Sequence, residues 1–485
     1  MDILFVTTEL APFVKVGGLA DVSAALPKTL RTLGHAVTVV LPRFASLEEG
    51  GLLFARRLTP LSLPMGDKTI DVTLFDGRLA SGVDLVLVDA PGLYDRASVY
   101  GERGEDYPDS DLRFAVLSRA AAEIARQRAQ GGKPYDVVHT NDWPTALTAA
   151  YVEVLRKETP ELAATKTVLT LHNVAHQGTF DAGRFGLLGL PANYASDSAL
   201  FAHGKSNFLQ QGIRSSDRVT TVSDGYAREI QTAAQGHGLE ALLASLPSPL
   251  VGIANGVDYG VWNPATDAAL ASRFDAEDRT SRARCRGALQ RELGFPLDPT
   301  APILASVSRL VPQKGIDVLA DAIPRLLRST DAQIVVVGHG DPELTARIDA
   351  AARASEGRVV HVANADETLV HRVFAGSDFV LMPSRFEPCG LVQLYAQRYG
   401  ALPVAHATGG LTDTIVDCDA ELETGTGFLF DELTKDALVA ATLRAVGAKI
   451  HPKFDDLQRR VMRLDRGWER PARRYEKLYK SVVAS

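Results

Sequence analysis

Short apolar runs alternate with amphipathic stretches along most of the chain. In the first half, the runs that predict strands are Ile3–Thr7, Val37–Leu41, Leu85–Val88, Val137–His139, Val168–Leu171 and Val219–Val222. In the second half they are Ile303–Val307, Ile334–Val337, Val359–Val362, Phe379–Met382 and Pro403–Ala405. Apolar runs separated by helical stretches are typical of parallel sheets covered by helices on both faces. We therefore expect an α/β fold.

Two helices are predicted from inner-face residues, most of them apolar, that are spaced at the helical period of about 3.6. After Gly18 these positions are Val22, Ala25, Leu26, Thr29, Leu30 and Leu33, and after Gly315 they are Ile316, Leu319, Ala320, Ile323 and Leu327. Each helix follows a strand and a turn that contains Lys and Gly. The two halves thus share one plan, which predicts two doubly wound domains.

A stretch rich in Pro, Gly and Asn, Ser245–Pro264, predicts the join between the halves. The mixture of acidic and basic residues at Thr266–Leu293 predicts a surface excursion with helices. Two doubly wound domains that face each other leave a cleft between the carboxyl ends of their strands. Open α/β sheets bind ligands at such a place.

Composition and charge narrow the class of protein. The 485 residues suffice for two large α/β domains, and the net charge of −7 argues against nucleic acid as a partner. Three widely spaced cysteines, Cys285, Cys389 and Cys418, form no disulfide framework and no zinc pattern. No apolar run reaches the ~20 residues of a membrane span, and no signal segment precedes the first predicted strand. We expect a cytoplasmic protein without a membrane partner; the sequence does not indicate its oligomeric state.

The turn Lys15–Asp21 is the first with ligand-binding chemistry. Gly17 and Gly18 allow backbone N–H groups to approach an anion, and the following helix adds the positive end of its dipole. Lys15 brings a full charge, and Asp21 can accept hydrogen bonds from sugar hydroxyls. An ordinary glycine-rich turn with a surface lysine explains the pattern equally well.

A second turn, Ser308–Gly315, joins a predicted strand to a predicted helix. Arg309 and Lys314 within it can hold a diphosphate together, since Arg gives directional bonds and Lys a point charge. The alternative is two solvated basic residues, which their place at the carboxyl end of a strand makes less favoured.

The third and most informative stretch is Ser384–Leu391, followed by Thr408–Leu411. Glu387 can bind sugar hydroxyls or stabilise positive charge at an anomeric carbon. It can equally satisfy N–H groups at a helix start. Cys389 fits a packing residue better than a nucleophile. A fixed carboxylate beside backbone N–H groups suits a ligand with a polyhydroxy part and an anionic part, such as a nucleotide sugar.

Polar residues also follow two strands of the first half, at His139–Trp143 and His172–Gly178. Because neighbouring parallel strands end at one edge of a sheet, we expect these clusters to converge. His172 is the better placed histidine, and His176 is interpreted as structural. No spacing of His, Cys and carboxylates predicts a metal site. Gly338-His339-Gly340 lacks the third glycine of a dinucleotide fingerprint, which disfavours a dehydrogenase.

Together these residues resemble the bacterial glycogen synthase and plant starch synthase family. The resemblance runs from Lys15–Leu19 through Ser384–Leu391 to the terminal stretch around Trp468 and Tyr475. It implies the GT-B fold, with two Rossmann-like domains at 1–250 and 251–465 and a last helix, 466–485, that returns to the first. It also implies retaining transfer of glucose from ADP-glucose to the non-reducing end of an α-1,4-glucan such as glycogen, without a metal or other cofactor.

The resemblance assigns roles residue by residue. It makes Lys15, His172, Arg309, Lys314 and Glu387 the catalytic set, with Arg309 and Lys314 on the diphosphate and Glu387 at the reacting glucose. Substrate-binding roles fall to Gly17, Gly18, Asp21, Asp142, Asn207, Cys389, Gly390, Leu391, Thr408, Gly409 and Gly410. Among these, Asp21 and Asp142 are expected near the glucose and acceptor, Asn207 on the sugar, and Thr408–Gly410 on the distal phosphate.

Two positions depart from the family pattern. Family members often have Tyr at the position of His176, and commonly Tyr at the position of Ala365, where an aromatic ring would stack on the nucleotide. The preference for ADP over UDP is therefore left open. The alternatives are another retaining GT-B transferase that uses UDP-glucose or a small acceptor, and a catalytically silent glucan-binding protein.

Overall fold

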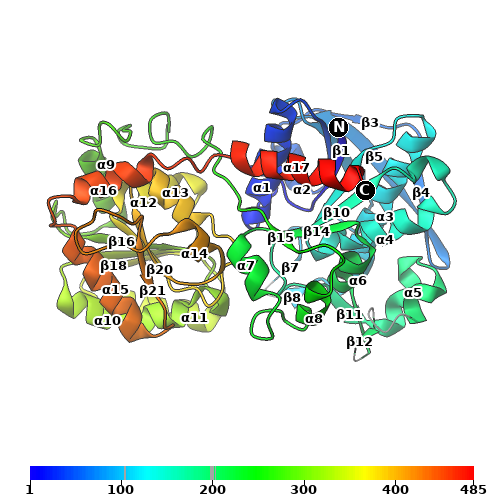
Figure 1. Ribbon diagram of the computed structural model, residues 1–485. Helices are drawn as coiled ribbons and strands as arrows, with labels where there is room; N and C mark the ends of the chain where they lie inside the picture. The colour runs from blue at the N-terminus through cyan, green and yellow to red at the C-terminus, as the bar shows by residue number, and fades with distance from the viewer. Residues whose placement is uncertain (103–104, 197–200, 203) are drawn as a thin grey trace. The chain divides into compact units, whose positions relative to one another are not determined.

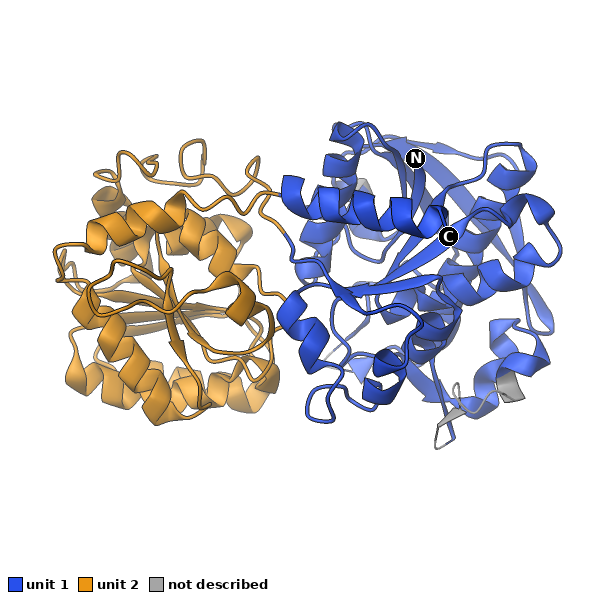
Figure 2. Ribbon diagram, in the orientation of Figure 1, with its two compact units in different colours: residues 1–255, 468–485 blue, residues 256–467 orange. Residues whose placement is uncertain are grey.

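The computed structural model describes residues 1–102, 105–196, 201–202 and 204–485 (Figure 1). The chain forms two compact units (Figure 2). Unit 1 comprises Met1–Asn255 and Trp468–Ser485, and unit 2 comprises Gly256–Gly467. The chain leaves unit 1 after residue 255, where the sequence predicted 250, and returns to it after residue 467, where the sequence predicted 465.

Unit 1 is built on a sheet with the strand order β15-β14-β10-β9-β1-β2-β6-β5-β3. Its parallel part consists of β15 (Val251–Gly252), β14 (Arg218–Thr221), β10 (Lys166–Leu171), β9 (Val137–Asn141), β1 (Asp2–Val6), β2 (Ala36–Pro42) and β6 (Asp84–Asp89). The six strands predicted for this half all lie there, with ends shifted by one or two residues.

Part of the unit 1 sheet is antiparallel, whereas the sequence predicted parallel sheets. Strand β5 (Lys68–Arg78) runs antiparallel to β6, and β3 (Phe54–Arg56) and β4 (Leu61–Met65) run antiparallel to β5. Near its middle β5 buries Val72 and Leu74 and leaves Asp71 exposed, so it lacks a continuous apolar run. Such alternation is the pattern of a sheet with one solvated face.

Helices connect or follow the strands of unit 1. They are α1 (Gly18–Thr32), α2 (Ala45–Glu49), α3 (Ser110–Gln130), α4 (Trp143–Arg156), α5 (Ala192–Ser196), α6 (Phe208–Ser215), α7 (Asp224–Glu229), α8 (Glu240–Ala244), α17 (Glu469–Val483) and the 3-10 helices η1 (Pro160–Leu162) and η2 (Ala182–Leu188). Smaller strands form β7 (Gly101–Glu102) with β8 (Glu105–Asp106), and β11 (Thr179–Asp181) with β13 (Lys205–Asn207) and β12 (Phe201–Ala202).

Unit 2 contains an all-parallel sheet with the order β18-β17-β16-β19-β20-β21. The strands are β18 (Val359–Val362), β17 (Gln333–Val337), β16 (Ile303–Val307), β19 (Phe379–Met382), β20 (Leu402–His406) and β21 (Phe428–Phe430). The five strands predicted here are confirmed, three of them to the residue. Strand β21 escaped prediction because its apolar run is only three residues long.

Helices lie on both faces of the unit 2 sheet (Figure 1). They are α9 (Arg282–Leu293), η3 (Pro312–Lys314), α10 (Ile316–Ser329), α11 (Pro342–Arg353), α12 (Glu367–Gly376), α13 (Val392–Arg398), α14 (Gly409–Thr414), α15 (Lys435–Ala448) and α16 (Phe454–Met462). Alternate strand residues enter separate core clusters, so that Leu304 packs with α10 and α15, whereas Ile303 and Ala305 pack with α9 and α12. Both faces are thus buried, which explains the continuous apolar runs.

The stretch Thr266–Leu293 is not merely a surface excursion, as the sequence predicted. Phe274, Cys285 and Leu289 are 5%, 4% and 1% exposed and belong to the core of unit 2. The charged residues of α9 hid this contribution, because only one face of the helix is apolar.

Helix α17 is fixed to the unit 1 sheet by a buried histidine. His139, on β9, contacts the Tyr479 hydroxyl through Nδ1 and the Thr170 hydroxyl through Nε2, each at 2.7 Å. Burial lowers the pKa of His139 to about 3, so the ring is neutral. Among the described residues, no helix combines the length and apolarity that a membrane crossing requires.

Candidate active site

The glycine turn of unit 1 is organised by Glu9, a residue that was not predicted from the sequence. Its carboxylate Oε2 accepts hydrogen bonds from the backbone N–H groups of Val16 and Gly17, at 2.9 and 2.8 Å. Oε1 accepts a third bond from the Tyr100 hydroxyl at 2.8 Å. Two N–H groups of the predicted anion-binding turn therefore already have a protein carboxylate as partner. The only signal was one acidic residue in an otherwise uncharged segment after β1.

Lys15 and Asp21 lie together on this turn. Lys15 Nζ contacts Asp21 Oδ1 at 2.9 Å, with side chains 30% and 19% exposed. Asp21 stands in the first turn of α1, where a carboxylate is favoured by the helix dipole. Gly17 is the N-cap and gives the helix no side-chain cap, while Gly18 is its first residue. The turn thus presents a cation and a carboxylate side by side at the carboxyl end of β1.

The two predicted polar clusters meet, because β9 and β10 are neighbours in the sheet. Asp142 Oδ1 accepts hydrogen bonds from the backbone N–H groups of His172 and Asn173, at 2.6 and 3.3 Å. The backbone of Asp142 has φ 55° and ψ −176°, a region that is almost exclusive to glycine. The strained backbone of Asp142 is thus tied, through its side chain, to the backbone of His172 and Asn173.

The tautomer of His172 follows from Asn141. The Asn141 amide donates to the Val6 carbonyl at 2.9 Å, so its Oδ1 faces His172 Nε2 at 3.0 Å. Nε2 must therefore carry the proton, and Nδ1 keeps a lone pair. Burial lowers the pKa of His172 to about 3, so the ring is neutral and can accept a hydrogen bond from a hydroxyl.

Burial shifts the pKa of Asp142 upward, whereas it shifts the pKa of His172 downward. Burial raises the pKa of Asp142 to about 7, although the N–H groups of His172 and Asn173 partly offset this and Glu9 adds repulsion. A carboxyl group whose pKa lies near neutrality can exchange a proton under working conditions.

The side chain of Asn207 makes structural hydrogen bonds, which explain this residue without a ligand. Its Oδ1 caps α6 by accepting from Gln210 N–H at 2.9 Å, and its Nδ2 donates to Gln177 Oε1 at 2.6 Å. The predicted sugar contact stays a prediction. His176 is exposed.

In unit 2, Lys314 and Glu387 form an ion pair. Lys314 Nζ lies 2.6 Å from Glu387 Oε2, and the Ser384 hydroxyl donates to the same oxygen at 3.0 Å. The Glu387 side chain is 7% exposed and that of Lys314 20%. Both residues are expected at the site from the sequence, but on different parts of the ligand. The structure joins them into one partly buried pair.

Gly315 makes this pair possible. Its φ is +66°, and a Cβ there would lie 1.8 Å from the Pro383 carbonyl oxygen. The loop that carries Lys314 can therefore approach the loop that carries Glu387 only because residue 315 has no side chain.

Arg309 stands apart from this pair. It is exposed, at the end of β16, and forms no ion pair within unit 2, all of whose residues are described. The neighbouring Leu310 is buried and exchanges backbone hydrogen bonds with His339 and Asp341, at 2.9 and 2.7 Å. The backbone beneath Arg309 is thus fixed while its guanidinium is available to an anion.

The two remaining loops of the candidate site are bonded to each other. Gly410 N–H donates to the Glu387 carbonyl at 2.9 Å, and Thr408 N–H donates to the His406 carbonyl at 2.9 Å. Two of the backbone donors predicted for the distal phosphate therefore already have acceptors. The role of Gly409 and of these donors stays a prediction.

Cys389, Gly390 and Leu391 turn the chain into α13. Cys389 is 3% exposed, and a Cβ on Gly410 would lie 2.4 Å from its Cα. Gly390 has φ +72°, and Leu391 is half-buried as the N-cap residue of α13. A buried thiol in such a contact fits the packing role expected for Cys389.

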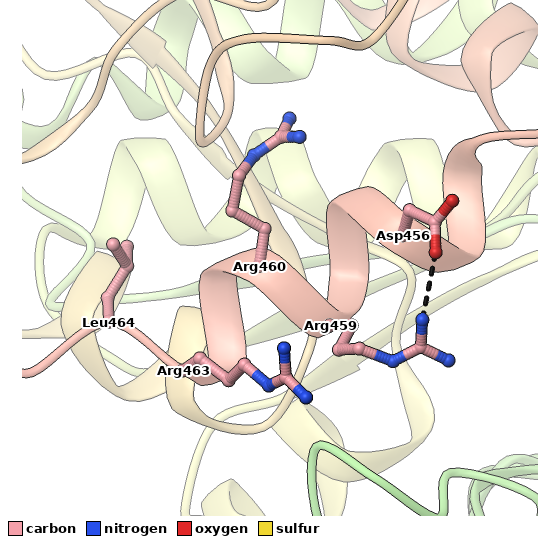
Figure 3. Close-up of a pocket in the computed structure, with 5 residues that line it drawn as sticks. All are labelled: Asp456, Arg459, Arg460, Arg463 and Leu464. Carbon is pink, nitrogen blue, oxygen red and sulfur yellow. Dashed lines mark hydrogen bonds and ion pairs between the residues drawn. The ribbon is translucent and has the colours of Figure 1, made fainter.

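A hollow of about 360 Å³ lies elsewhere in unit 2, along α16 (Figure 3). It is lined by Asp456, Arg459, Arg460, Arg463 and Leu464. Arg459 contacts Asp456 at 2.9 Å, Arg463 contacts Glu277 at 2.6 Å, and Arg460 donates to four backbone carbonyls. Since each arginine has partners, we assign no ligand to this hollow. Among the described residues, no three His, Cys, Asp or Glu side chains are grouped to hold a metal ion.

Comparisons with known proteins cover the whole chain. Residues 2–245 match the starch synthase catalytic domain, and residues 293–453 match glycosyl transferases group 1. Glycogen synthases of Anaeromyxobacter sp. (strain Fw109-5) and Thioalkalivibrio sulfidiphilus (strain HL-EbGR7) are 42% and 43% identical to this chain, over 100% of both chains in each case. Glycogen synthase 2 of Agrobacterium fabrum is 43% identical over 100% of this chain and 93% of its own.

Solved structures agree. The catalytic domain of starch synthase IV from Arabidopsis thaliana, bound to ADP and acarbose, superposes with a TM-score of 0.91 at 31% identity and covers 100% of this chain and 99% of its own. Sucrose-phosphate synthase from Thermosynechococcus elongatus, at a TM-score of 0.60 and 17% identity over 100% of this chain and 99% of its own, shares the fold. The predicted fold and enzyme class are confirmed, and the chain belongs to the bacterial glycogen synthase and starch synthase family of GT-B glycosyltransferases.

Proposed function

We propose that this protein is a glycogen synthase that transfers glucose from ADP-glucose to the non-reducing end of an α-1,4-glucan with retention of configuration. The observation that carries the proposal is the identity of about 42% to glycogen synthases over the full length of both chains. The starch synthase IV domain, which was solved with ADP and acarbose, supports the donor nucleotide and a glucan-like acceptor.

The chemistry depends on the leaving group. As the bond between glucose and diphosphate loosens, negative charge grows on the diphosphate, and cations fixed beside it stabilise the transition state. Arg309 supplies an exposed guanidinium that forms no ion pair within unit 2, all of whose residues are described. Lys314 is held by Glu387 at 2.6 Å through one of its three ammonium protons, so the others stay available to phosphate oxygens.

No protein nucleophile is part of this mechanism. In retaining transfer of this kind the departing phosphate itself can accept the proton of the acceptor hydroxyl. His172 contributes the lone pair on Nδ1 as an acceptor for a sugar hydroxyl, since its Nε2 proton is held by Asn141. Asp142 orients the backbone of His172.

The proposal includes no metal or other cofactor, because Arg309 and Lys314 provide the positive charge that the diphosphate requires. Its partners are ADP-glucose and an α-1,4-glucan. The cytoplasmic location expected from the sequence stays a prediction.

Position 365 bears on which nucleotide the donor carries. Ala365 precedes Asp366, whose side chain caps α12 by accepting from Leu369 N–H at 2.7 Å. A methyl group at position 365 offers no ring for the base to stack on. Use of UDP-glucose is therefore the alternative that must be tested.

A donor screen tests the proposal. Purified protein is incubated with ADP-glucose or UDP-glucose that carries a label in its glucose. The acceptor is glycogen, maltose or a sugar phosphate. We expect label in glycogen from ADP-glucose at a rate at least about tenfold above UDP-glucose, a difference of ~1.4 kcal/mol. Exclusive use of UDP-glucose would overturn the donor, label only on small acceptors would favour another transferase, and glucan binding without transfer would favour a silent protein.

A further inference from the structure

The loop that carries Lys314 and the loop that carries Glu387 are joined by hydrogen bonds beside Lys314. The Arg385 backbone N–H donates to the Gln313 carbonyl at 2.8 Å. Gln313 Nε2 donates in return to the Phe386 carbonyl at 3.3 Å. Both bonds are made by the residue that precedes Lys314, and neither reaches helix α10, which follows it.

The side chain of Arg385 spans Lys314. Its Nη1 donates to the Pro312 carbonyl at 2.7 Å and to Asp317 Oδ1 at 2.8 Å. Its Nη2 donates to Asp317 Oδ2 at 2.6 Å. Pro312 lies two residues before Lys314, and Asp317 lies three residues after it. One guanidinium therefore holds both sides of the segment that carries Lys314.

The carboxylate partner of Arg385 is well placed for this role. Asp317 lies in the first turn of α10, where the helix dipole favours a carboxylate. Hydrogen bonds from Arg385 lower the pKa of Asp317 below its ordinary value, so the group is charged. A bidentate pair between a planar guanidinium and a carboxylate fixes orientation as well as distance.

Arg385 is also close to the partner of Lys314 along the chain. It precedes Glu387 by two residues, and Glu387 Oε2 lies 2.6 Å from Lys314 Nζ. The ammonium group of a lysine ends a flexible stem, so its position depends on the backbone that carries it and on the group that it contacts. Arg385 connects the backbone of Lys314 to the loop of Glu387.

We propose that Arg385 is a positioning residue, which fixes the Lys314 segment to the Glu387 loop through Asp317 and Pro312 and so places the Lys314 ammonium for the leaving diphosphate. Without the guanidinium the segment loosens, and the ammonium is less often where negative charge develops. Arg385 itself does not touch the substrate. The inference rests on the proposed function, because Lys314 acts on the diphosphate there.

The exposure of the pair separates positioning from a general structural role. The side chains of Arg385 and Asp317 are 40% and 29% exposed. Ion pairs that are open to water contribute little to global stability. Loss of Arg385 should therefore leave the unfolding temperature within about 3 °C of wild type. A large decrease in turnover at nearly unchanged stability is the signature of positioning.

The test measures kcat and KM for glucose transfer from ADP-glucose to glycogen by Arg385→Met, with Arg444→Met as the matched control. Arg444 on α15 donates to both carboxylate oxygens of Asp417 and to the Leu429 carbonyl, at 2.9, 2.6 and 3.0 Å. Its side chain is 44% exposed. Arg444 thus has the same kinds of partner as Arg385, away from the Lys314 segment. Methionine keeps an unbranched apolar side chain and has no donor.

We expect kcat of Arg385→Met to be at least about tenfold lower than that of wild type, with KM for glycogen within about twofold. Arg444→Met should stay within about twofold of wild type in both. In a Lys314→Ala background, Arg385→Met should cost less than about twofold more, because the group that it positions is absent. A wild-type kcat in Arg385→Met, or an equal loss with and without Lys314, would overturn the proposal.

Asp317→Asn tests the pair from its other side and serves also where Arg385→Met does not fold. An amide has one oxygen, so it cannot accept both guanidinium bonds. We expect kcat to decrease at least about threefold, and Arg385→Met and Asp317→Asn combined to be no slower than about twofold below Arg385→Met alone. A kcat of Asp317→Asn equal to wild type, or losses that multiply in the combined variant, would show that the two residues do not act as a pair.

Hydrogen-exchange mass spectrometry tests the same inference without catalysis. We expect the amides of residues 311–318 to exchange faster in Arg385→Met than in wild type, and at the wild-type rate in Arg444→Met. If wild type transfers no glucose, the proposed function fails, and the exchange rates still decide whether Arg385 holds the Lys314 segment. Unchanged exchange of residues 311–318 in Arg385→Met would refute the positioning role.

Discussion

Asp142 has an unfavourable backbone conformation and a buried carboxyl group. Its backbone lies in a region that costs non-glycine residues about 1–3 kcal/mol, and its carboxyl group is buried with a pKa of about 7. Both features persist because the backbone N–H groups of His172 and Asn173 hold the side chain in place. Strain of this kind gathers at functional sites, which agrees with the role expected for Asp142.

The raised pKa gives a stability prediction with a definite sign. The folded protein keeps the Asp142 proton up to about pH 7, whereas the unfolded chain loses it near the ordinary value of 3.8. Stability from the protonated form is therefore present at low pH and is lost as the pH rises from about 4 to 7.

Asp142→Asn removes this ionisation and keeps the shape of the side chain. In urea unfolding we expect the free energy of unfolding of the variant, relative to wild type, to increase between pH 4.5 and 7. The upper limit is about 1.4 kcal/mol for each pH unit. Above about pH 7.5 the difference should be constant. A difference that is independent of pH would show that Asp142 is not protonated in the folded protein.

At the scale of elements, the loop after β1 and the β7–β8 hairpin are joined through Glu9. Tyr100, just before the hairpin, donates to Glu9 and also contacts the Thr8 hydroxyl at 2.8 Å. Burial and the Glu9 carboxylate raise the pKa of Tyr100 well above its ordinary value, so its hydroxyl stays a donor. Glu9 in turn fixes the N–H groups that hold the Lys15 turn.

Glu9→Gln should therefore loosen the Lys15 turn. An amide cannot accept all three hydrogen bonds, because its NH₂ group is a donor. We expect kcat/KM for ADP-glucose to decrease at least about tenfold and the amides of residues 10–20 to exchange faster in hydrogen-exchange mass spectrometry. Tyr100→Phe, which removes only one of the bonds, should have a smaller effect on both. Unchanged exchange in Glu9→Gln would refute the anchoring role.

Elements whose signal is local could be predicted from the sequence. Five of the six strands of unit 2 were predicted almost to the residue, because strands buried on both faces are continuous apolar runs. Strands β3–β5 were missed. A strand with one solvated face alternates apolar and polar residues, and its polar positions resemble those of a loop.

The contacts of the candidate site are not local, and the sequence could not predict them. Lys314 and Glu387 are 73 residues apart and meet through the contact of Gly315 with Pro383. The carboxylate that occupies the glycine turn, Glu9, was overlooked because only the folded loop brings it to Val16 and Gly17. Motifs in the sequence name the residues that are expected at the site, but they do not name the partners that these residues contact in the structure.

At the scale of the whole molecule, each of the two units carries its own set of candidate functional residues. Unit 1 holds Lys15, Asp21, Asp142 and His172 at the carboxyl ends of β1, β9 and β10. Unit 2 holds Arg309 and the Lys314–Glu387 pair after β16 and β19. In both units the candidate residues come after the carboxyl ends of strands, which is where doubly wound sheets bind ligands.

The central claim is that these two sets serve one transfer reaction. The most direct measurement is kcat/KM for glucose transfer from ADP-glucose to glycogen by Lys15→Ala, which alters unit 1, and Lys314→Ala, which alters unit 2. The control is Lys435→Ala, an exposed lysine without an ion-pair partner in fully described unit 2. We predict a loss of at least ~100-fold in each active-site variant, the scale of one strong transition-state contact, and no loss in the control. Near-normal transfer by either Lys15→Ala or Lys314→Ala, in a protein that unfolds within about 3 °C of wild type, would contradict the account.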